Sequence, residues 1–590
     1  MLDAIRDSPF GLIVRFLTKD KYLRHVEELD TFQHPYYPTS AEVSSKDPQA
    51  VETVSSSSIS ITSENTASST DPERGDEEKH DENVVRRLVT QQSLHAEQKE
   101  HSEVIKPTRT SEGYILVDWY TTDDPENPQN WSALKKHFVA FVICFYSFVV
   151  YFGSSITVGA VPEVVEKFGI SIEVSSLALA LYVLGYGLGP LLFAPLSEIA
   201  SVGRNAPYII TLFIYTMLWI GAATVQNFPG YLVLRFLTGF FGSPALATGG
   251  ASFGDIYPLV KVPYALVFWG AATVMGPALA PVVANFSAPA KSWHWVSWEM
   301  LWASAPVCLI WFLFVPETSA STILYYRARR LRRITRNERY RTKEEIEQLS
   351  DPGNAATSPK GILYNAIMKP AQINALDPAV LFSTIYTSLV YAIFYSFFES
   401  FPLIFEEVYH FRFEVSGLPF LAVLPALFLA SALIAFYWYI SVVRHFPTKG
   451  FEAFGAPEGR LVPALLTSLW SPIGLFITAW ASRPHIHWIV PTIGLSLTIL
   501  GTYTIIACIL QYLAFTYPRY AASLFAANDF ARSMLAAGAV MFSRPMFKRL
   551  GIDWGISLLA FANLVCCVLL VGLWRFGAAL RKRSRFAEGG

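Results

Sequence analysis

Residues 235–281 read RFLTGFFGSPALATGGASFGDIYPLVKVPYALVFWGAATVMGPALAP and contain two apolar spans joined by a short turn. Small residues recur at every fourth position in both spans. The two sets are Gly239, Ser243, Ala247 and Ala251, and Ala272, Gly276, Ala280 and Ala284. Small residues at this spacing form a groove in which two helix backbones approach closely inside a membrane. The first span also carries Arg235, and a charge in a lipid-spanning helix is costly and usually functional.

The composition of the chain excludes an ordinary soluble domain. Of its 590 residues, 52% are hydrophobic and 16% are charged, whereas a soluble domain is about 25% charged. Residues 1–136 hold 25 acidic and 15 basic residues, a net charge of −10, and the remaining residues hold 22 and 31, a net charge of +9. An acidic tail therefore precedes an apolar, basic body. All five cysteines lie in apolar spans, so neither a disulfide framework nor a metal cluster is expected.

Apolar spans of membrane-crossing length, roughly 18–25 residues, follow one another from residue 137. Six precede a polar loop and six follow it, near 137–160, 174–195, 208–226, 231–256, 264–284 and 295–315, and near 378–400, 415–442, 461–481, 486–510, 517–543 and 553–575. Two six-span halves are the layout of parallel-repeat transporters. We therefore expect an all-α integral membrane protein with twelve transmembrane helices in two six-helix bundles.

The same pattern divides the chain into five parts. They are a cytoplasmic tail at 1–136, largely disordered at 39–110, a first bundle at 137–315, a central cytoplasmic loop at 316–375, a second bundle at 376–576 and a basic tail at 577–590. The first long apolar run begins near His137, so no cleavable signal peptide is expected. Residues 10–17 are amphipathic and flanked by basic residues, which leaves open both a membrane-surface helix and a locally folded tail.

Lysine and arginine in the loops predict the orientation. With the N-terminus inside, the loops after even-numbered spans, the central loop and the C-terminal tail hold most of the basic residues. We therefore expect both termini in the cytoplasm. Asn285-Phe286-Ser287 then falls in the outer loop after span five, where Asn285 is a candidate for N-glycosylation.

Several motifs together resemble one family. They are APLSEIASVGRNAPY at 194–208, the fourth-span residues Arg235, Gly239, Ser243-Pro244, Ala247-Thr248-Gly249-Gly250 and Asp255, the fifth-span residues Gly270, Gly276-Pro277 and Ala280-Pro281, Pro316-Glu317-Thr318, PEGRL at 457–461, and YPRYAAS with NDFARS in span eleven. The chain resembles the fungal drug:proton antiporters of the twelve-span major facilitator superfamily, in the benomyl- and fluconazole-resistance group. One departure is Ala280, which stands where the antiporter motif usually has glycine.

The resemblance implies proton-coupled efflux of amphipathic drugs across the plasma membrane by alternating access. It implies no cofactor, with the proton gradient as the energy source. The expected partners are a small-molecule substrate, protons and the lipid bilayer, without nucleic acid, and the expected state is a monomer. The chain has no GxxxxGK[ST] sequence, which disfavours an ATP-driven pump.

The resemblance assigns roles to charged residues in spans two to four. It implies that Arg235 holds a negative partner and tunes its proton affinity; the alternative is an arginine that snorkels to the outer interface. Glu198 and Arg204 would latch the two halves on the cytoplasmic side, against the alternative of a solvated pair. Asp255 is either a member of a gating ion pair or an interfacial charge. Arg235 and Asp255 are separated by roughly 30 Å of helix and cannot pair.

Other candidates lie in spans five to eleven. Pro277 and Pro281, with Gly270, Gly276 and Ala280, would shape the interface between bundles, because each proline removes a helix hydrogen bond; an ordinary membrane kink is the alternative. Asp529 and Arg532 lie at i, i+3 on one helix face and can pair, either as a neutralised structural pair or as a proton relay.

The substrate path is expected among aromatic and acidic residues. An aromatic-lined cavity suits flat apolar or cationic drugs. The candidates are Tyr186, Tyr391, Tyr395, Phe398, Glu399 and Glu299. Either glutamate is also a candidate partner of Arg235.

Three other functions share much of this pattern. A dedicated exporter of one fungal secondary metabolite or toxin would carry every motif, and uptake of a nutrient such as a polyamine is a further possibility. A non-transporting membrane sensor would use the acidic tail and the central loop for signalling, but it would not need charges inside the spans.

Overall fold

The first bundle is formed by the helices between Ala133 and Phe314. The computed structural model describes residues 5–29, 104–105, 109–110, 113–350, 361, 368, 372–374, 376–517 and 521–583. The helices of the first bundle are α4 (Ala133–Ser155), α5 (Val161–Phe168), α6 (Ile172–Ser175), α7 (Leu177–Glu198), α8 (Asn205–Thr224), α9 (Phe228–Gly242), α10 (Pro244–Ile256), α11 (Val262–Ala290) and α12 (Trp295–Phe314). The 3-10 helix η3 (Ile156–Ala160) joins α4 to α5.

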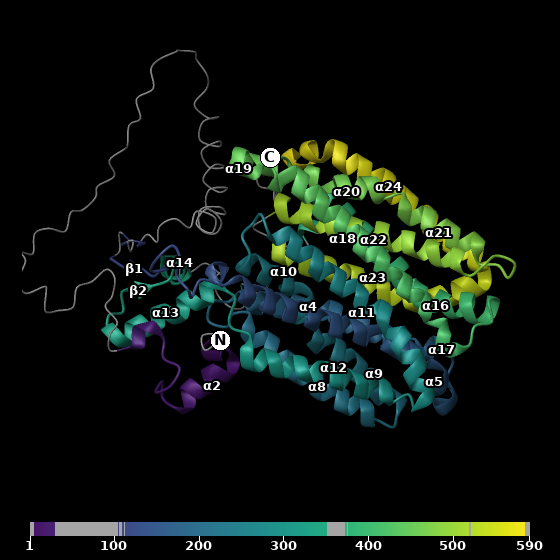
Figure 1. The fold of residues 1–590 in the computed structure, drawn as a ribbon, viewed down its shortest axis with the longest axis horizontal. Helices are drawn as coiled ribbons and strands as arrows, with labels where there is room; N and C mark the ends of the chain where they lie inside the picture. The colour runs from purple at the N-terminus through teal and green to yellow at the C-terminus, as the bar shows by residue number, and fades with distance from the viewer. Residues whose placement is uncertain are drawn as a thin grey trace, which may run out of the picture.

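The second bundle lies beside the first (Figure 1). Its helices are α16 (Pro378–Phe401), α17 (Phe413–Ser416), α18 (Val423–Trp438), α19 (Phe446–Lys449), α20 (Val462–Thr467), α21 (Trp470–Ala481), α22 (Ile489–Thr516), α23 (Ala521–Leu550) and α24 (Ile552–Arg583). α7 packs on α23, and α11 packs on α18 and α22, so these helices form the interface between the bundles. Because α24 continues to Arg583, the expected basic tail at 577–590 begins as helix.

Ten segments in the described part of the chain are long and apolar enough to cross a membrane. The two other expected spans correspond to the α9–α10 pair and to α23. α9 and α10 have 15 and 13 residues because the chain breaks between them at Ser243 and Pro244, and each piece is shorter than a span. α23 has 30 residues but includes Asp529, Arg532 and Arg544, which lower its hydropathy.

Gly239 and Gly276, one from each predicted stripe, pack against helices of the same bundle. A Cβ atom at Gly239 of α9 would overlap the carbonyl oxygen of Tyr182 in α7. A Cβ atom at Gly276 of α11 would lie 2.7 Å from the carbonyl oxygen of Phe148 in α4. Glycine therefore permits α9 to approach α7, and α11 to approach α4, at backbone contact.

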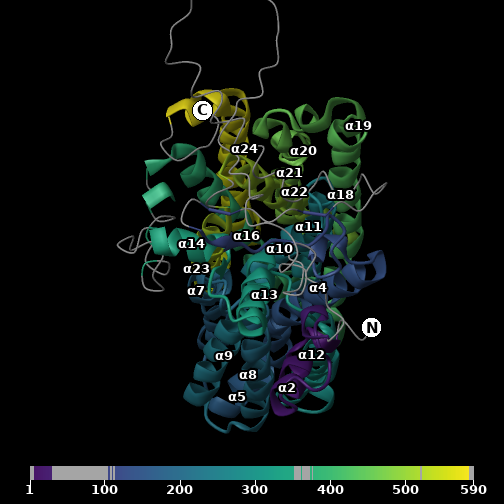
Figure 2. The same ribbon diagram turned by 90° about the vertical axis from the view of Figure 1, so that its left-hand side faces the viewer.

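A small layer covers one end of the first bundle (Figure 2). It consists of α2 (Pro9–Leu17), the 3-10 helix η1 (Val26–Glu28), β1 (Ile115–Leu116), α13 (Ala320–Thr335), β2 (Tyr340–Arg341) and α14 (Lys343–Ser350). β1 pairs in parallel with β2. The described parts of the predicted tail and of the predicted central loop therefore fold together, whereas most of the expected disorder at 39–110 falls outside the described residues.

Buried ion pairs fasten this layer together. The guanidinium of Arg327 lies 2.7 Å from Asp124 and 2.9 Å from Glu126, and that of Arg330 lies 3.1 Å from Glu126. His25 Nδ1 lies 3.0 Å from the other oxygen of Glu126. Burial favours the neutral acid, but the hydrogen bond with His25 and the charges of the two arginines hold the pKa of Glu126 well below its usual range.

Candidate functional site

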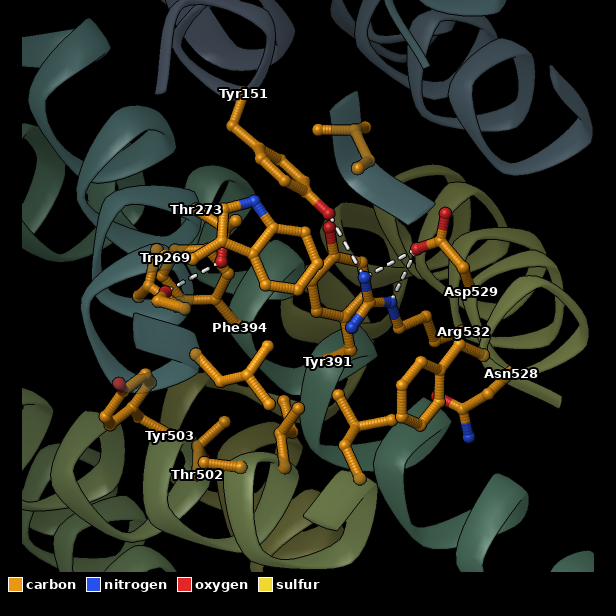
Figure 3. A pocket seen from close by; sticks show the side chains of 18 of the residues that line it. Tyr151, Trp269, Thr273, Tyr391, Phe394, Thr502, Tyr503, Asn528, Asp529 and Arg532 are labelled. Carbon is orange, nitrogen blue, oxygen red and sulfur yellow. Dashed lines mark hydrogen bonds and ion pairs between the residues drawn. The ribbon is translucent and has the colours of Figure 1, made fainter. Parts of the chain in front are cut away.

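A cavity lies between the two bundles. α4, α10 and α11 line it from the first bundle, and α16, α22 and α23 line it from the second (Figure 3). The side chains that define its character are Tyr151, Leu246, Trp269, Thr273, Tyr391, Phe394, Thr502, Tyr503, Gln511, Asn528, Asp529 and Arg532. The wall is thus aromatic, with one group of charges on α23.

Asp529 and Arg532 form an ion pair in this wall. Arg532 Nε lies 2.8 Å from Asp529 Oδ1, and another guanidinium nitrogen of Arg532 donates to the hydroxyl of Tyr151 across the interface at 3.1 Å. Asp529 is 3% exposed, and its Oδ2 has no hydrogen-bond partner among the described residues. The pair therefore leaves one carboxylate oxygen without a donor, and Figure 3 shows this oxygen turned away from Arg532.

Hydrogen bonds between hydroxyl groups, which include that of Tyr391, connect the two bundles. The Tyr186 hydroxyl lies 2.6 Å from that of Tyr391 and 3.0 Å from that of Tyr395. The Tyr395 hydroxyl in turn lies 3.1 Å from Ser154 Oγ. These contacts join α7 and α4 to α16, so they hold the two bundles together at one side of the cavity.

A second cavity lies beyond these hydroxyl groups, between α6 and α16. Phe398 and Glu399 line it, together with Asn285 and Arg544. Glu399 accepts a hydrogen bond from Ser176 Oγ at 2.8 Å. Among the predicted substrate-path residues, Tyr391 lines the first cavity, Phe398 and Glu399 line the second, and Glu299 lines neither of these two.

The prediction that Asn285 lies in an outer loop is wrong. Asn285 is part of α11 and is 4% exposed. Its Nδ2 donates to Ser416 Oγ at 3.1 Å and to the carbonyl oxygen of Phe413 at 3.2 Å. The amide nitrogen that would carry a glycan is therefore occupied inside the bundle interface, and the glycosylation hypothesis is not carried further.

Arg235 is completely buried, which contradicts the snorkelling alternative. Its guanidinium donates to the carbonyl oxygens of Gly153 (2.9 Å), Ser154 (2.8 Å) and Ala178 (3.1 Å). It stacks over the ring of Tyr182 at 4.4 Å. It forms no ion pair with a described residue, so the structure does not provide the expected negative partner in Glu299 or Glu399.

Two of the three carbonyl groups that accept hydrogen bonds from Arg235 lie at the end of α4. α4 ends at Ser155 and continues as the 3-10 helix η3. The last carbonyl oxygens of an α-helix have no donor within the helix. Arg235 supplies donors to two of them and to α7, and it thereby ties α4, α7 and α9 together.

Of the residues predicted to form a latch, Arg204 pairs with Asp255 and not with Glu198. Arg204 Nε lies 2.6 Å from Asp255 Oδ2, so Asp255 is a member of an ion pair. Glu198 makes no hydrogen bond or ion pair in the described structure and is exposed. Glu317 accepts from the backbone N–H groups of Arg204 and Asn205 at 3.2 and 3.0 Å. Burial raises the pKa of Glu317, and these backbone donors oppose the increase.

The proline motif fits a continuous helix. α11 runs through Pro277 and Pro281. Pro281 has no N–H to donate to the carbonyl oxygen of Pro277 four residues earlier. Ser155 Oγ donates to that oxygen at 2.7 Å instead. Ala280 is fully buried in the same turn, and Gly270 faces Tyr503 of the second bundle.

A sequence model of the Major Facilitator Superfamily matches residues 143–541. This chain belongs to that superfamily. MFS-type transporter pyvG of Aspergillus violaceofuscus is 46% identical over 82% of this chain and 87% of its own length. Fluconazole resistance protein 1 of Saccharomyces cerevisiae is 37% identical over 80% of this chain and 85% of its own length.

A solved structure of the superfamily has the same fold. The xylose transporter XylE from E. coli, in a partially occluded inward open conformation, matches with a TM-score of 0.50 and 13% identity, over 75% of this chain and 99% of its own. The prediction of an all-α protein with the superfamily fold is confirmed. The chain is therefore a multi-pass membrane protein of a transporter family and not an enzyme.

Sequence reasoning missed several residues of the site. Tyr151, Trp269 and Tyr503 line the cavity but lie in spans that contain many aromatic residues. Trp269 Nε1 donates to Ser147 Oγ at 2.8 Å, and the Tyr503 hydroxyl donates to the carbonyl oxygen of Val267 at 2.7 Å. These aromatic side chains differ from lipid-facing ones in that each has an O–H or N–H group, which usually forms a hydrogen bond when it is buried.

Proposed function

We propose that this protein exports amphipathic small molecules in exchange for protons. The observation that carries the proposal is the aromatic cavity between the bundles with a buried, half-satisfied aspartate in its wall. Aromatic faces bind flat apolar and cationic molecules. An ionisable residue inside a membrane bundle is costly and marks a substrate or proton path. Membership of a transporter superfamily and similarity to a fluconazole resistance protein support export.

Asp529 is the proposed proton carrier. When the cavity opens to the outside, the free Oδ2 of Asp529 takes up a proton and the outgoing substrate is released. When the cavity opens to the cytoplasm, the proton leaves Oδ2 and the carboxylate is again paired with Arg532. Inward proton movement is thereby coupled to outward substrate movement. Arg532 pairs with this carboxylate, and Tyr151 and Tyr391 contact the Arg532 guanidinium.

The proposed location is the plasma membrane, with both termini in the cytoplasm. In that orientation the cavity lies between the cytoplasmic half of α11 and the cytoplasmic half of α22. The hydroxyl groups that connect Ser154 to Tyr391 and the contacts of Asn285 lie on the outer side. The structure then corresponds to a state that is closed toward the outside.

The test uses a yeast strain that lacks its own exporters. Cells that express the chain are loaded with a labelled azole or a fluorescent dye, and efflux is followed with and without a protonophore. The Asp529→Asn variant is expected to lose protonophore-sensitive efflux at equal surface level. Asp553→Asn, at the N-terminus of α24, is the matched control and is expected to retain it. Protonophore-sensitive efflux at full rate in Asp529→Asn would exclude Asp529 as the carrier.

A second candidate function is export of one dedicated metabolite. It is left open by the higher identity to MFS-type transporter pyvG, whose name specifies no drug, 46% against 37% for the fluconazole resistance protein. The two functions differ in substrate range. Efflux of several unrelated drugs supports multidrug export, whereas a well-expressed protein that exports none of them supports the dedicated exporter.

A further inference from the structure

α2 presents an apolar face that no described residue covers. The exposed fractions are 84% for Phe16, 72% for Leu17, 56% for Leu12 and 48% for Ile13. The opposite face of the helix contains Arg15, which is 8% exposed and forms ion pairs with acidic residues of the same segment. α2 is therefore an amphipathic helix whose polar face is held by the protein while its apolar face points away from it.

α2 lies against the end of a membrane-spanning helix of the first bundle. The ring of Phe10 packs edge-to-face on Phe312 at 5.9 Å, and Phe312 lies two residues before the end of α12. Figure 2 shows α2 at the rim of the first bundle, beside α12. The exposed side chains of α2 thus continue the lipid-facing surface of a membrane-spanning helix, as amphipathic interfacial helices do.

A basic cavity opens between α2 and α13. Its wall contains Leu12 of α2 and five arginines, namely Arg15, Arg329, Arg330, Arg332 and Arg333. Arg330, Arg332 and Arg333 form ion pairs with Glu126, Glu345 and Glu28, respectively. Arg329 is exposed and forms no ion pair with a described residue. Asp20 and Glu338 also lie in the wall, and Arg15 pairs with Asp20 and Glu28. The positive charge that this cavity offers to a ligand is therefore that of Arg329.

We propose that this cavity binds the headgroup of an anionic phospholipid of the cytoplasmic leaflet. The phosphate would bind beside Arg329, and the acyl chains would lie along Leu12 and Phe16. Leu12 belongs both to the wall of the cavity and to the exposed face of α2, so the site joins a basic pocket to an apolar surface. A free anion would use the arginines but not this apolar face. The inference rests on the proposed orientation, in which α13 is cytoplasmic, and not on the identity of the transported substrate.

The test measures stabilisation of the purified full-length protein by added lipid. The thermal denaturation midpoint in detergent is followed against dioctanoyl phosphatidylserine, dioctanoyl phosphatidylcholine and inorganic phosphate. We expect the midpoint to rise with phosphatidylserine and not with the other two. Arg329→Gln is expected to weaken the apparent affinity about fivefold, since one arginine near an anionic lipid contributes about that factor. Arg336→Gln, at the end of the same helix and outside the cavity, is the control and should bind as the unchanged chain does.

Additional variants and ligands distinguish binding of the lipid from binding of other molecules. The double variant Leu12→Ser, Phe16→Ser should bind phosphatidylserine more weakly, and retention of the lipid in native mass spectrometry should fall in parallel. Equal affinities of Arg329→Gln and Arg336→Gln would overturn the proposal. Stabilisation by inorganic phosphate to the same extent would assign the cavity to free anions. Equal stabilisation by phosphatidylcholine would show that the headgroup is not recognised. None of these results depends on transport, so they leave the proposed function untouched.

Discussion

Replacement of Arg235 by lysine is expected to destabilise the first bundle while it preserves the charge. The guanidinium makes three hydrogen bonds to carbonyl oxygens, of Gly153, Ser154 and Ala178, at 2.8–3.1 Å. A lysine ammonium is a compact group at the end of a flexible stem and does not reproduce the fork of a guanidinium. We expect it to retain one of the three contacts and to leave two buried carbonyl oxygens without a donor.

The magnitude follows from these two lost bonds. A hydrogen bond that involves a charged group contributes about 1.5–3 kcal/mol, so the loss amounts to about 3–6 kcal/mol. Unfolding entropy is about 2 cal/mol/K per residue, and the bundles extend over about 450 residues from Ala133 to Arg583. One kcal/mol then corresponds to about 1 °C, and the midpoint should fall by about 3–6 °C.

The assay is thermal denaturation of the detergent-purified protein, followed by size-exclusion chromatography. Arg412→Lys, on an exposed residue before α17, is the matched control and should leave the midpoint unchanged. An unchanged midpoint in Arg235→Lys would refute the structural role. A shifted pH dependence of transport at normal stability would instead support the sequence-based hypothesis that Arg235 tunes a proton-binding group.

Three further predictions concern other parts of the molecule. Peptide-N-glycosidase should not change the mobility of the protein made in yeast, and Asn285→Gln should lower stability through its lost interface bonds; a mobility shift that disappears in this variant would contradict the buried placement. Arg204→Ala and Asp255→Asn should be non-additive, with a coupling of at least about 0.5 kcal/mol between contacting residues, and additive midpoints would show that the 2.6 Å pair does not form. The pKa of Glu126 in the folded protein is depressed. The ionised Glu126 therefore stabilises the layer formed by α2, η1 and α13 above pH 4.5, its ordinary pKa, and this stabilisation is lost as the pH falls through the lower pKa of the folded state. The protection of residues 5–29 from hydrogen exchange, relative to the intrinsic rate at each pH, should therefore be constant from pH 7 to about 5 and decrease below 4.5. A loss of protection already near pH 6 would argue against this cluster.

The sequence predicted what depends on spacing along one helix. The small residues at every fourth position include Gly239 and Gly276, where helix backbones pack closely. The i, i+3 spacing brought Asp529 and Arg532 onto one face, where they form an ion pair. Hydropathy located both bundles because membrane spans carry a long and uniform apolar signal.

Contacts between distant segments could not be predicted in this way. Arg204 pairs with Asp255 and not with the nearer Glu198, because the end of α10 approaches the start of α8. Asn285 has the local sequence of a glycosylation site, but α11 extends past the predicted end of its span and buries it. The docking of Glu126 on α13 joins segments about 200 residues apart, and no local pattern encodes such a contact.

Proton release on substrate binding tests the coupling by Asp529 most directly. The purified protein is placed in weakly buffered detergent solution with a pH-sensitive dye, and a transported drug is added. The proposed mechanism predicts release of protons by the unchanged chain, none by Asp529→Asn, and normal release by Asp553→Asn. Equal proton release by Asp529→Asn and the unchanged chain would contradict the assignment of Asp529 as the carrier.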